Sequence, residues 1–580
     1  MKTVTITILV VCLAVVALPL HVRADTGAYL TGYTACSWNS DDCNGCVPDV
    51  PGAVATLRQY GDVSGFHMSG YDVTLGEHWQ GVQRLMVAGA RHLVISRSHD
   101  DTGAFVVVHM ASRDQGGERF RSNRLGPSDL EDTLPPSTDR IEVYESIDSD
   151  YAHAGGIQTI GHWLAVPLEG SHSSAAARII FYDLAQPTSP IKRYEVDSGW
   201  EHAGTASIGK LSDGRYLLVI GGFDANPIKF YISSGTNLSS DPQFAFADEW
   251  TKDEAETEIG DTNWGAYQNI NVVNQCDGQL YLIGLHNEGW PIAGNKDWID
   301  AWRLEMDANT YDVRLVKVAN RHVYCSWGFV EDQCNLDAAA GVYVDPHGRL
   351  LAYSTTHNDD GPDSTTSFEE FRSQVWPTSC QGIDEGWSEL YDDRDYQDRS
   401  LMVDFVDRDL EAYGDFNSVE GFNDKTSSAR WCLPSGYRHA LYTDHGFVDL
   451  LTTLDGDGTS RERNVTSDET SSARFEGQTE SGWLPVIRRS LRDGIGGPLA
   501  PSQIPYLLAG THDVPPGSGL TVLGGATVLF MPDARLIVDG ALTIDGREEA
   551  IRLASAQDRG TGMRIESQLV VRDGAGIRMR

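Results

Sequence analysis

Hydrophobic residues along the chain fall mainly in short runs, which Gly, Asp, Asn and Pro separate. Two typical runs are His92-Leu-Val-Ile-Ser and Tyr216-Leu-Leu-Val-Ile. Short apolar runs that are bounded by turn-forming residues, without the 3.6-residue spacing of an amphipathic helix, predict β-strands. Nearly every run between residues 26 and 380 is of this kind. We therefore expect the chain to be all-β.

The strands between residues 26 and 380 form a repeat. Each copy has a strand rich in small residues, then a turn, then a more apolar strand with a polar tip. The copies begin about 50–75 residues apart, at His78, His153, His202, Trp264 and Ala339. This is the spacing of propeller blades, whose inner strands use small residues because they crowd the axis. We predict a five-bladed β-propeller over residues 26–380, with residues 26–70 closing the ring; the sequence leaves open whether the ring has five blades or six.

A second region, residues 386–480, contains an internal duplication. The aromatic segment Leu390-Tyr391-Asp392 matches Leu441-Tyr442-Thr443, and an acidic loop ending in two serines follows each. The loops are Asn423-Asp424-Lys425-Thr426-Ser427-Ser428 and Ser467-Asp468-Glu469-Thr470-Ser471-Ser472. This pattern resembles a βγ-crystallin domain of two Greek-key motifs. The calcium signature of that family is two Asn or Asp residues, two variable residues, Ser or Thr, and Ser; the second loop departs from it at Ser467.

The resemblance implies two calcium sites. It implies that Asp424 and Ser427 give side-chain oxygens and Lys425 its carbonyl. By residue, the first site comprises Asn423, Asp424, Lys425 and Ser427, and the second comprises Asp468, Glu469 and Ser471. Ca²⁺ prefers six to eight oxygen ligands, which such loops can supply. The alternative is a pair of solvated turns, since Asn, Asp and Ser are common in turns.

The third region, residues 500–580, has short apolar strands between Gly and Asp turns, such as Leu536-Ile-Val-Asp-Gly and Leu542-Thr-Ile-Asp-Gly. Strands at this spacing resemble the coils of a right-handed β-helix. A small β-sandwich is the alternative. The fold class that we predict is thus all-β and multidomain: a propeller, a βγ-crystallin-like domain and a short β-helix.

Residues 1–24 resemble a secretory signal peptide, because an apolar run follows Lys2 and small residues precede the expected cut after Ala24. A membrane anchor is the alternative, but the run is shorter than the roughly 20 residues that span a bilayer. We therefore expect secretion without membrane insertion. Eight cysteines remain after removal of the signal.

In an exported chain an even number of cysteines indicates disulfides, whose connectivity the sequence leaves open. Cys325 and Cys334 could close a short loop. Cys43-Asn44-Gly45-Cys46 has the form of half a zinc site, but no second Cys-x-x-Cys completes it. We therefore expect these cysteines to form disulfides.

The charge of the chain narrows the possible partners. The sequence has 83 acidic and 45 basic residues in a length of 580, with a formal charge of −38. A surface this negative repels nucleic acid and anionic lipid heads and attracts cations. We expect calcium to bind and nucleic acid not to bind.

Three histidines stand out in the propeller region. His78, His153 and His202 occupy the same place in three repeats, so in a propeller they would point toward the central channel together. Converging imidazoles suit a transition metal or acid–base catalysis. A structural role between blades is the alternative. A further possibility is a sugar site made of acidic residues near Trp79 and Trp264.

Two functions follow from these patterns. The first is a secreted calcium-binding protein that interacts with an extracellular glycan or a surface protein. The second is an extracellular propeller hydrolase or lyase that acts on a polymer, with the channel histidines as metal ligands or as acid and base. The sequence leaves open whether the chain is an enzyme.

Overall fold

The computed structural model describes the strands and many of the turns between residues 29 and 579. The described residues are 29–36, 42–59, 61–67, 78–87, 90–98, 102–110, 121–122, 140–148, 151, 153–169, 176–200, 202–240, 242–288, 296–324, 334–336, 339–345, 348–355, 365–375, 380, 386–391, 400–404, 426–444, 448–465, 470, 472–479, 482–487, 506–508, 511–514, 519–523, 527–530, 535–538, 541–545, 552–555, 568–571 and 576–579. The expected signal peptide, residues 1–24, lies outside them.

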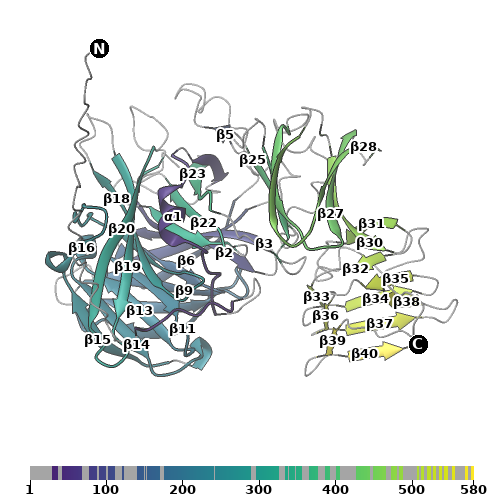
Figure 1. The fold of residues 1–580 in the computed structure, drawn as a ribbon. Helices are drawn as coiled ribbons and strands as arrows, with labels where there is room; N and C mark the ends of the chain where they lie inside the picture. The colour runs from purple at the N-terminus through teal and green to yellow at the C-terminus, as the bar shows by residue number, and fades with distance from the viewer. Residues whose placement is uncertain are drawn as a thin grey trace, which may run out of the picture.

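The described strands form five antiparallel blades in a closed ring, which confirms the predicted propeller; the blades make up the purple-to-teal part of Figure 1. The innermost strands contact one another in the cyclic order β2, β8, β12, β17, β21 and back to β2. The predicted repeats are correct, because these strands lie where the five copies begin. Strand β1 (Asp62–His67) pairs antiparallel with β23 (Thr365–Arg372). The last blade therefore takes its outermost strand from the start of the chain, which closes the ring.

Each blade is built from consecutive hairpins. From the axis outward, the first blade is β2 (His78–Val87), β3 (Ala90–Ser98), β4 (Gly103–His109) and β6 (Arg140–Asp148). The second blade is β7 (His153–Ala154) with β8 (Gln158–Ile160), then β9 (Trp163–Glu169), β10 (Arg178–Asp183) and β11 (Ile191–Asp197). The third blade is β12 (Thr205–Lys210), β13 (Tyr216–Gly221), β14 (Ile228–Ser233) and β15 (Phe244–Trp250).

The last two blades complete the ring in the same way. They are β17 (Asn269–Asn274), β18 (Leu280–Glu288), β19 (Lys296–Met306) and β20 (Val313–Val323), with the short β16 (Glu256–Thr257) at the edge; and β21 (Ala340–Val344), β22 (Leu350–Thr355), β23 and β1, beside which the short β5 (Arg121–Ser122) pairs. The structure thus has five blades.

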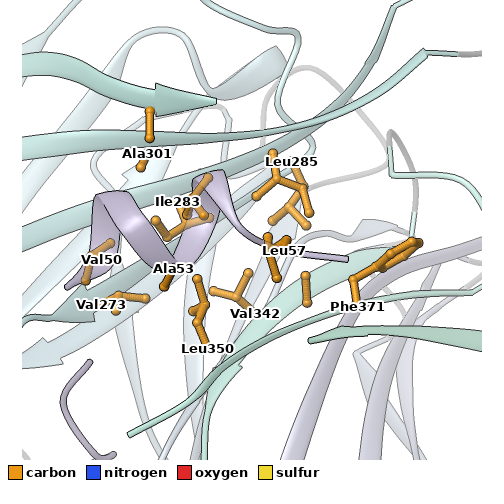
Figure 2. Close-up of a cluster of buried hydrophobic side chains, with 14 of the residues drawn as sticks. Val50, Ala53, Leu57, Val273, Ile283, Leu285, Ala301, Val342, Leu350 and Phe371 are labelled. Atoms are coloured by element: carbon orange, nitrogen blue, oxygen red, sulfur yellow. The ribbon is translucent and has the colours of Figure 1, made fainter. Parts of the chain in front are cut away.

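Hydrophobic clusters between neighbouring blades hold the ring together. The cluster between the fourth and fifth blades also contains the helix α1 (Val50–Ala55), as Figure 2 shows. The helix begins where the Asp49 side chain accepts a hydrogen bond from the amide of Gly52. Its apolar face, with Val50 and Ala53, packs onto Ile283 and Leu350 from the two blades.

The segment that precedes α1 covers the lower face of the propeller, which is the face where the innermost strands end. Asn44 donates a hydrogen bond of 2.7 Å to the carbonyl of Thr159, and Lys210 Nζ lies 2.7 Å from the Asp42 carboxylate. Disulfides join Cys36 to Cys43 and Cys46 to Cys276. A third joins Cys380 to Cys432, and Cys334 is also disulfide-bonded. The expectation of disulfides in place of zinc at Cys43 and Cys46 is therefore confirmed; Cys325 lies outside the described residues.

A second module, residues 386–487, consists of a four-stranded sheet and the first four strands of a seven-stranded sheet; Figure 1 shows this module in green. In order, the sheets are β25 (Ser400–Asp404), β24 (Trp387–Tyr391), β26 (Ser428–Cys432) and β29 (Ser460–Asn464); and β28 (Val448–Asp455), β27 (Tyr437–Asp444), β30 (Ser472–Thr479) and β31 (Gly482–Ile487). Strand β29 belongs to the second half of the duplication but pairs with β26 of the first half. The two halves therefore share a core, which includes Leu390, Leu441 and Phe475.

The last described strands form a stack of parallel ladders that continues from β31. Strand β31 pairs with β32, and from β32 on each strand pairs with the third strand after it, giving the ladders β31-β32-β35-β38, β33-β36-β39 and β34-β37-β40. The strands are β32 (Tyr506–Leu508), β33 (Thr511–Val514), β34 (Gly519–Leu523), β35 (Thr527–Phe530), β36 (Arg535–Val538), β37 (Ala541–Asp545), β38 (Arg552–Ser555), β39 (Gln568–Val571) and β40 (Gly576–Met579). Three parallel ladders side by side are the pattern expected of a β-helix, and both that assignment and its right hand stay predictions.

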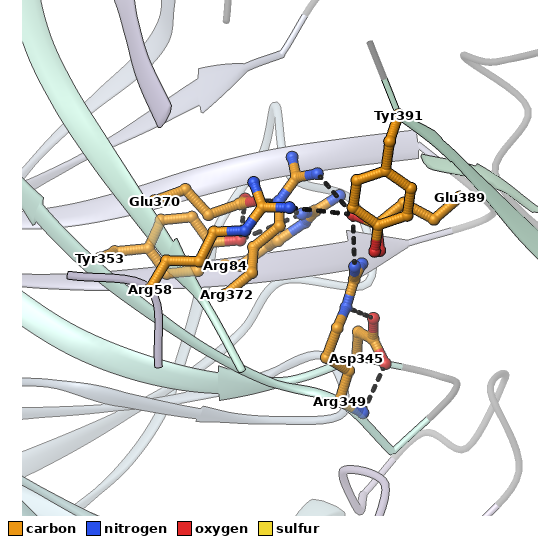
Figure 3. A network of polar contacts seen from close by, with 9 residues as sticks. All are labelled: Arg58, Arg84, Asp345, Arg349, Tyr353, Glu370, Arg372, Glu389 and Tyr391. Atoms are coloured by element: carbon orange, nitrogen blue, oxygen red, sulfur yellow. Dashed lines mark hydrogen bonds and ion pairs between the residues drawn. The ribbon is translucent and has the colours of Figure 1, made fainter. Parts of the chain in front are cut away.

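A buried cluster of charges joins the second module to the propeller (Figure 3). Glu389 of β24 is 1% exposed, and its Oε1 lies 3.8–3.9 Å from the guanidinium groups of Arg58, Arg349 and Arg372. The Tyr391 hydroxyl donates a hydrogen bond to the same carboxylate. One carboxylate thus binds three arginines of the propeller.

Candidate functional site

The predicted histidines lie on the upper face of the propeller, which we define as the face where the innermost strands begin. His78 and His153 are the first residues of β2 and β7, and His202 closely precedes β12. Because the second strand of each blade is antiparallel to the first, its last residue lies at this face too. In the second blade that residue is Glu169, which stands opposite His153 in the register of β7 and β9.

Glu169 connects the histidines of two blades. Its Oε2 lies 3.5 Å from Nδ1 of His153, and its Oε1 lies 3.7 Å from Nδ1 of His202. The amide of Ala203 donates a hydrogen bond of 2.8 Å to Oε1, which fixes the carboxylate. The ring centroid of His78 lies 6.3 Å from that of His153. We call His78, His153, His202 and Glu169 the histidine–carboxylate cluster.

The structure thus brings the three predicted histidines together and adds a carboxylate that sequence reasoning missed. A signal for Glu169 was present, because it ends the apolar strand Trp163–Glu169 at the place of the polar tip. Its partner His202 could not be paired with it from the sequence, because the two residues belong to different blades.

Water reaches the cluster, but unevenly. The exposed fraction of the side chain is 20% for Glu169, 29% for His153 and 50% for His202. Burial lowers the pKa of His153 below its ordinary value, and the charge of Glu169 opposes this shift. His153 is therefore a neutral imidazole near pH 7. Such a group can accept a proton, and the adjacent carboxylate then stabilises the imidazolium.

Side-chain amides fill the axis below the cluster, where we expected an open channel. Gln158 Oε1 accepts hydrogen bonds from the amides of Ile208, at 3.1 Å, and Val272, at 2.9 Å. The backbones of neighbouring blades also come close together at Gly155, where a Cβ would lie 1.9 Å from the carbonyl oxygen of Gly204. A ligand of the cluster would therefore lie on the upper face.

The two tryptophans considered for a sugar site have different surroundings. Trp79 is fully buried in the core between the first and fifth blades, so it has no surface for a ligand. Trp264 is half-buried and packs against Trp250 and Trp302, with ring centroids 4.7 and 4.8 Å away. Its indole nitrogen donates a hydrogen bond of 3.3 Å to the carbonyl of Asp224, which is another residue of the upper face.

Most of the predicted calcium ligands lie outside the described residues: Asn423, Asp424, Lys425, Asp468, Glu469 and Ser471. Ser427 is described and nearly buried. The strands that border the two loops have the same register, because Tyr391 pairs with Ser428 as Tyr442 pairs with Ser472. Thr426 and Thr470, at the same place in the two loops, are fully buried, and their hydroxyls have no hydrogen-bond partner.

Two features are absent from the described residues: a cluster of metal ligands and a membrane-spanning helix. No group of three or more His, Cys, Asp or Glu side chains among them is arranged to hold a metal ion. No helix in the same part of the chain is long and apolar enough to cross a membrane.

Comparison with known proteins gave matches to solved structures only. No family model matches the sequence, and no curated protein matches it. A GH43 beta-xylosidase/alpha-arabinofuranosidase from a compost metagenome is 11% identical, with a TM-score of 0.30, over 53% of this chain and 94% of that protein. A GH32 beta-fructofuranosidase of Bombyx mori is 10% identical, with a TM-score of 0.31, over 74% and 93%.

A family 117 glycoside hydrolase of Zobellia galactanivorans is 9% identical, with a TM-score of 0.28, over 55% of this chain and 92% of that protein. These TM-scores and identities are too low to carry an argument about this chain. Its fold follows from its own strand pairing, and its function must be argued from its own residues.

Proposed function

We propose that the chain is an extracellular hydrolase or lyase that acts on a polymer through the histidine–carboxylate cluster. The observation that carries this proposal is the place of Glu169, whose two oxygens lie 3.5 and 3.7 Å from histidines of two successive blades. The half-exposed side chain of His202 suits contact with a long substrate. The disulfides of the chain support the extracellular location.

The contacts favour chemistry over a purely structural role for the histidines. A histidine that only joins blades would be buried and hydrogen-bonded. Here the His202 side chain is half exposed, and Nδ1 of His153 has no hydrogen-bond partner although a carboxylate oxygen lies nearby. Contacts between catalytic groups are often long before substrate binds and shorten in the complex.

In this proposal each of three residues has a role. His153 is the base: its neutral ring takes a proton from water in a hydrolase, or from the substrate carbon in a lyase. Glu169 orients the imidazole and stabilises the positive charge that forms. His202, on the other side of Glu169, gives a proton to the leaving oxygen. The proton that leaves one histidine is replaced through solvent.

The test is a screen of the purified protein against polysaccharides and other extracellular polymers, measuring new chain ends. We expect His153→Gln and Glu169→Gln to lower the rate at least about 100-fold, as for the loss of a general base. His162→Gln is the matched control, because His162 Nε2 also lies 3.4 Å from a carboxylate, that of Asp183, elsewhere in the second blade. Equal losses in all three variants would refute the proposal.

A second function, calcium binding by the second module, rests on a different observation. Strand β29 pairs with β26 of the other half, and the strands beside the two loops have the same register. Both observations support two equivalent Greek-key motifs. The buried hydroxyls of Thr426 and Thr470 lie beside both loops without a partner. The donors are oxygens, which fit calcium.

By the family resemblance, Asp424, Lys425 and Ser427 would hold one ion, with Asn423 supporting the loop. Asp468, Glu469 and Ser471 would hold the other. The ions would link the ends of strands and stabilise the module, which would support a role in surface binding.

Thermal melting in calcium and in chelator tests this second function. Calcium at 100 times its dissociation constant stabilises the form that binds it by about 2.7 kcal/mol. We expect the shift to vanish in the double variant Asp424→Ala, Asp468→Ala. Asp457→Ala is the control, since Asp457 is an exposed carboxylate in another turn of the module. A shift that survives the double variant would contradict the assignment.

A further inference from the structure

We propose that the turn after β13 is a sugar-binding subsite next to the histidine–carboxylate cluster, and that the polymer is a neutral or cationic polysaccharide. This inference rests on the proposed function, because it places the subsite beside the residues assigned to catalysis. The residues of the subsite are Trp200, Phe223, Asp224 and Gln268. Asp224 contacts Trp264 and so is one of the acidic residues that the sequence patterns suggested for a sugar site; the other three were not considered there.

The backbone of the turn keeps an aromatic ring in solvent. Asp224 and Ala225 have φ values of +54° and +49°, in the left-handed region that residues other than glycine seldom adopt. Such a conformation costs about 1–3 kcal/mol per residue and is found mainly at functional sites. Phe223, directly before them, is 69% exposed, the highest value among the exposed large apolar side chains that the structure describes. A ring held open to water at the mouth of a site suits stacking against the CH face of a sugar.

The carboxyl of Asp224 is fixed beside this ring. Its Oδ1 accepts a hydrogen bond of 3.2 Å from Nε2 of Gln268, in the fourth blade. Its carbonyl accepts the hydrogen bond from the Trp264 indole, so two contacts hold the turn against the next blade. Burial raises the pKa of Asp224 above its ordinary value. A half-buried carboxyl and an amide together offer acceptors and donors for sugar hydroxyls.

Trp200 connects the turn with the cluster. Its ring lies over Gly222, where an added Cβ would come within 2.1 Å of Cη2 of the indole. On its other side the Trp200 ring centroid lies 5.5 Å from that of His202. The contacts therefore run from His202 through Trp200 to Gly222, the residue before Phe223. A sugar chain that reaches the cluster can contact the turn with a neighbouring unit.

Charge selects the class of polysaccharide. The groups that face a sugar here include the carboxylates of Glu169 and Asp224, and the whole chain has a formal charge of −38. Lys229 lies 4.8 Å from the Trp200 ring, but its charge is paired with Glu249 at 3.7 Å. A polyanion such as pectate would be repelled. A β-glucan or chitosan would not.

The test is affinity electrophoresis in gels that contain a β-glucan, chitosan or pectate. The protein with Glu169→Gln serves as the parent, so that cleavage does not obscure binding. We expect Phe223→Ala to weaken retention about 10-fold, which corresponds to about 1.4 kcal/mol for one stacked ring. Phe246→Ala is the matched control, because Phe246 is 57% exposed on β15 of the same blade. Asp224→Asn should weaken retention as well.

The outcomes separate this inference from the proposed function. Weaker retention in Phe223→Ala but not in Phe246→Ala supports the subsite, even if no polymer is cleaved. Equal retention in both variants overturns it, even if the cluster proves catalytic. Retention in pectate alone overturns the assignment of the polysaccharide class. Because Phe223 is exposed, we expect its variant to melt as the parent does.

Discussion

Replacing Glu389 by Gln tests whether the second module is held to the propeller by charge. Glu389 is almost fully buried, and three arginines of the propeller lie within 3.9 Å of its Oε1. Gln has nearly the same size and can still accept the hydrogen bond that Tyr391 donates. The substitution therefore removes the negative charge and little else.

The expected cost is large, because three buried guanidinium groups lose the charge of Glu389, although Arg349 keeps the carboxylate of Asp345 and Arg372 keeps that of Glu370. Removing one partner of a buried ion pair typically destabilises a protein by about 3–5 kcal/mol. The three contacts at Glu389 are 3.8–3.9 Å long, beyond hydrogen-bond distance. We therefore expect a loss near the lower end, about 3 kcal/mol in the free energy of unfolding.

Urea unfolding, followed by tryptophan fluorescence, measures this loss. Glu462→Gln is the control, since Glu462 lies in the same module, 3.0 Å from Arg430, but its side chain is 58% exposed. An exposed pair contributes less than about 1 kcal/mol. The reasoning would be refuted if Glu389→Gln were no more destabilising than Glu462→Gln.

Three further predictions concern the propeller. Burial would raise the pKa of Glu370, but the charges of Arg372 and Arg84 hold this pKa well below its usual 4.5. The contribution of Glu370 to the free energy of unfolding should therefore be complete above pH 4.5 and decrease as the pH falls. The variant Glu370→Gln should reduce the acid sensitivity of unfolding. Gly341→Ala should destabilise the chain by about 1–3 kcal/mol in urea, because its Cβ would lie 1.9 Å from a backbone oxygen of β2. The lowered pKa of His153 means that the folded state binds fewer protons than the unfolded state. The free energy of unfolding should therefore decrease as the pH falls below about 6.5, and His153→Gln should flatten the profile of stability against pH there. The proposed activity should also decrease on the acid side of this pH.

Much of the architecture could be predicted from local patterns. Apolar runs of strand length between turn residues predicted an all-β chain, and small residues at the start of each copy predicted the inner strands of five blades. Such signals are local because the alternation of a strand and the chemistry of a turn depend on residues close together in the sequence. The histidines were found in the same way, by their equal places in three copies.

Tertiary structure alone decided which of these residues meet. The distance of 3.7 Å between Glu169 and His202 depends on the angle between two blades, and no local pattern records that angle. The same is true of β29, which pairs outside its own half, and of the arginines around Glu389, which come from separate parts of the propeller. Sequence by itself determined that the chain is all-β and where the innermost strands of the blades begin, because burial and turn preference act locally. The candidate site and the joining of the modules depend on packing between distant segments, which only the folded chain defines.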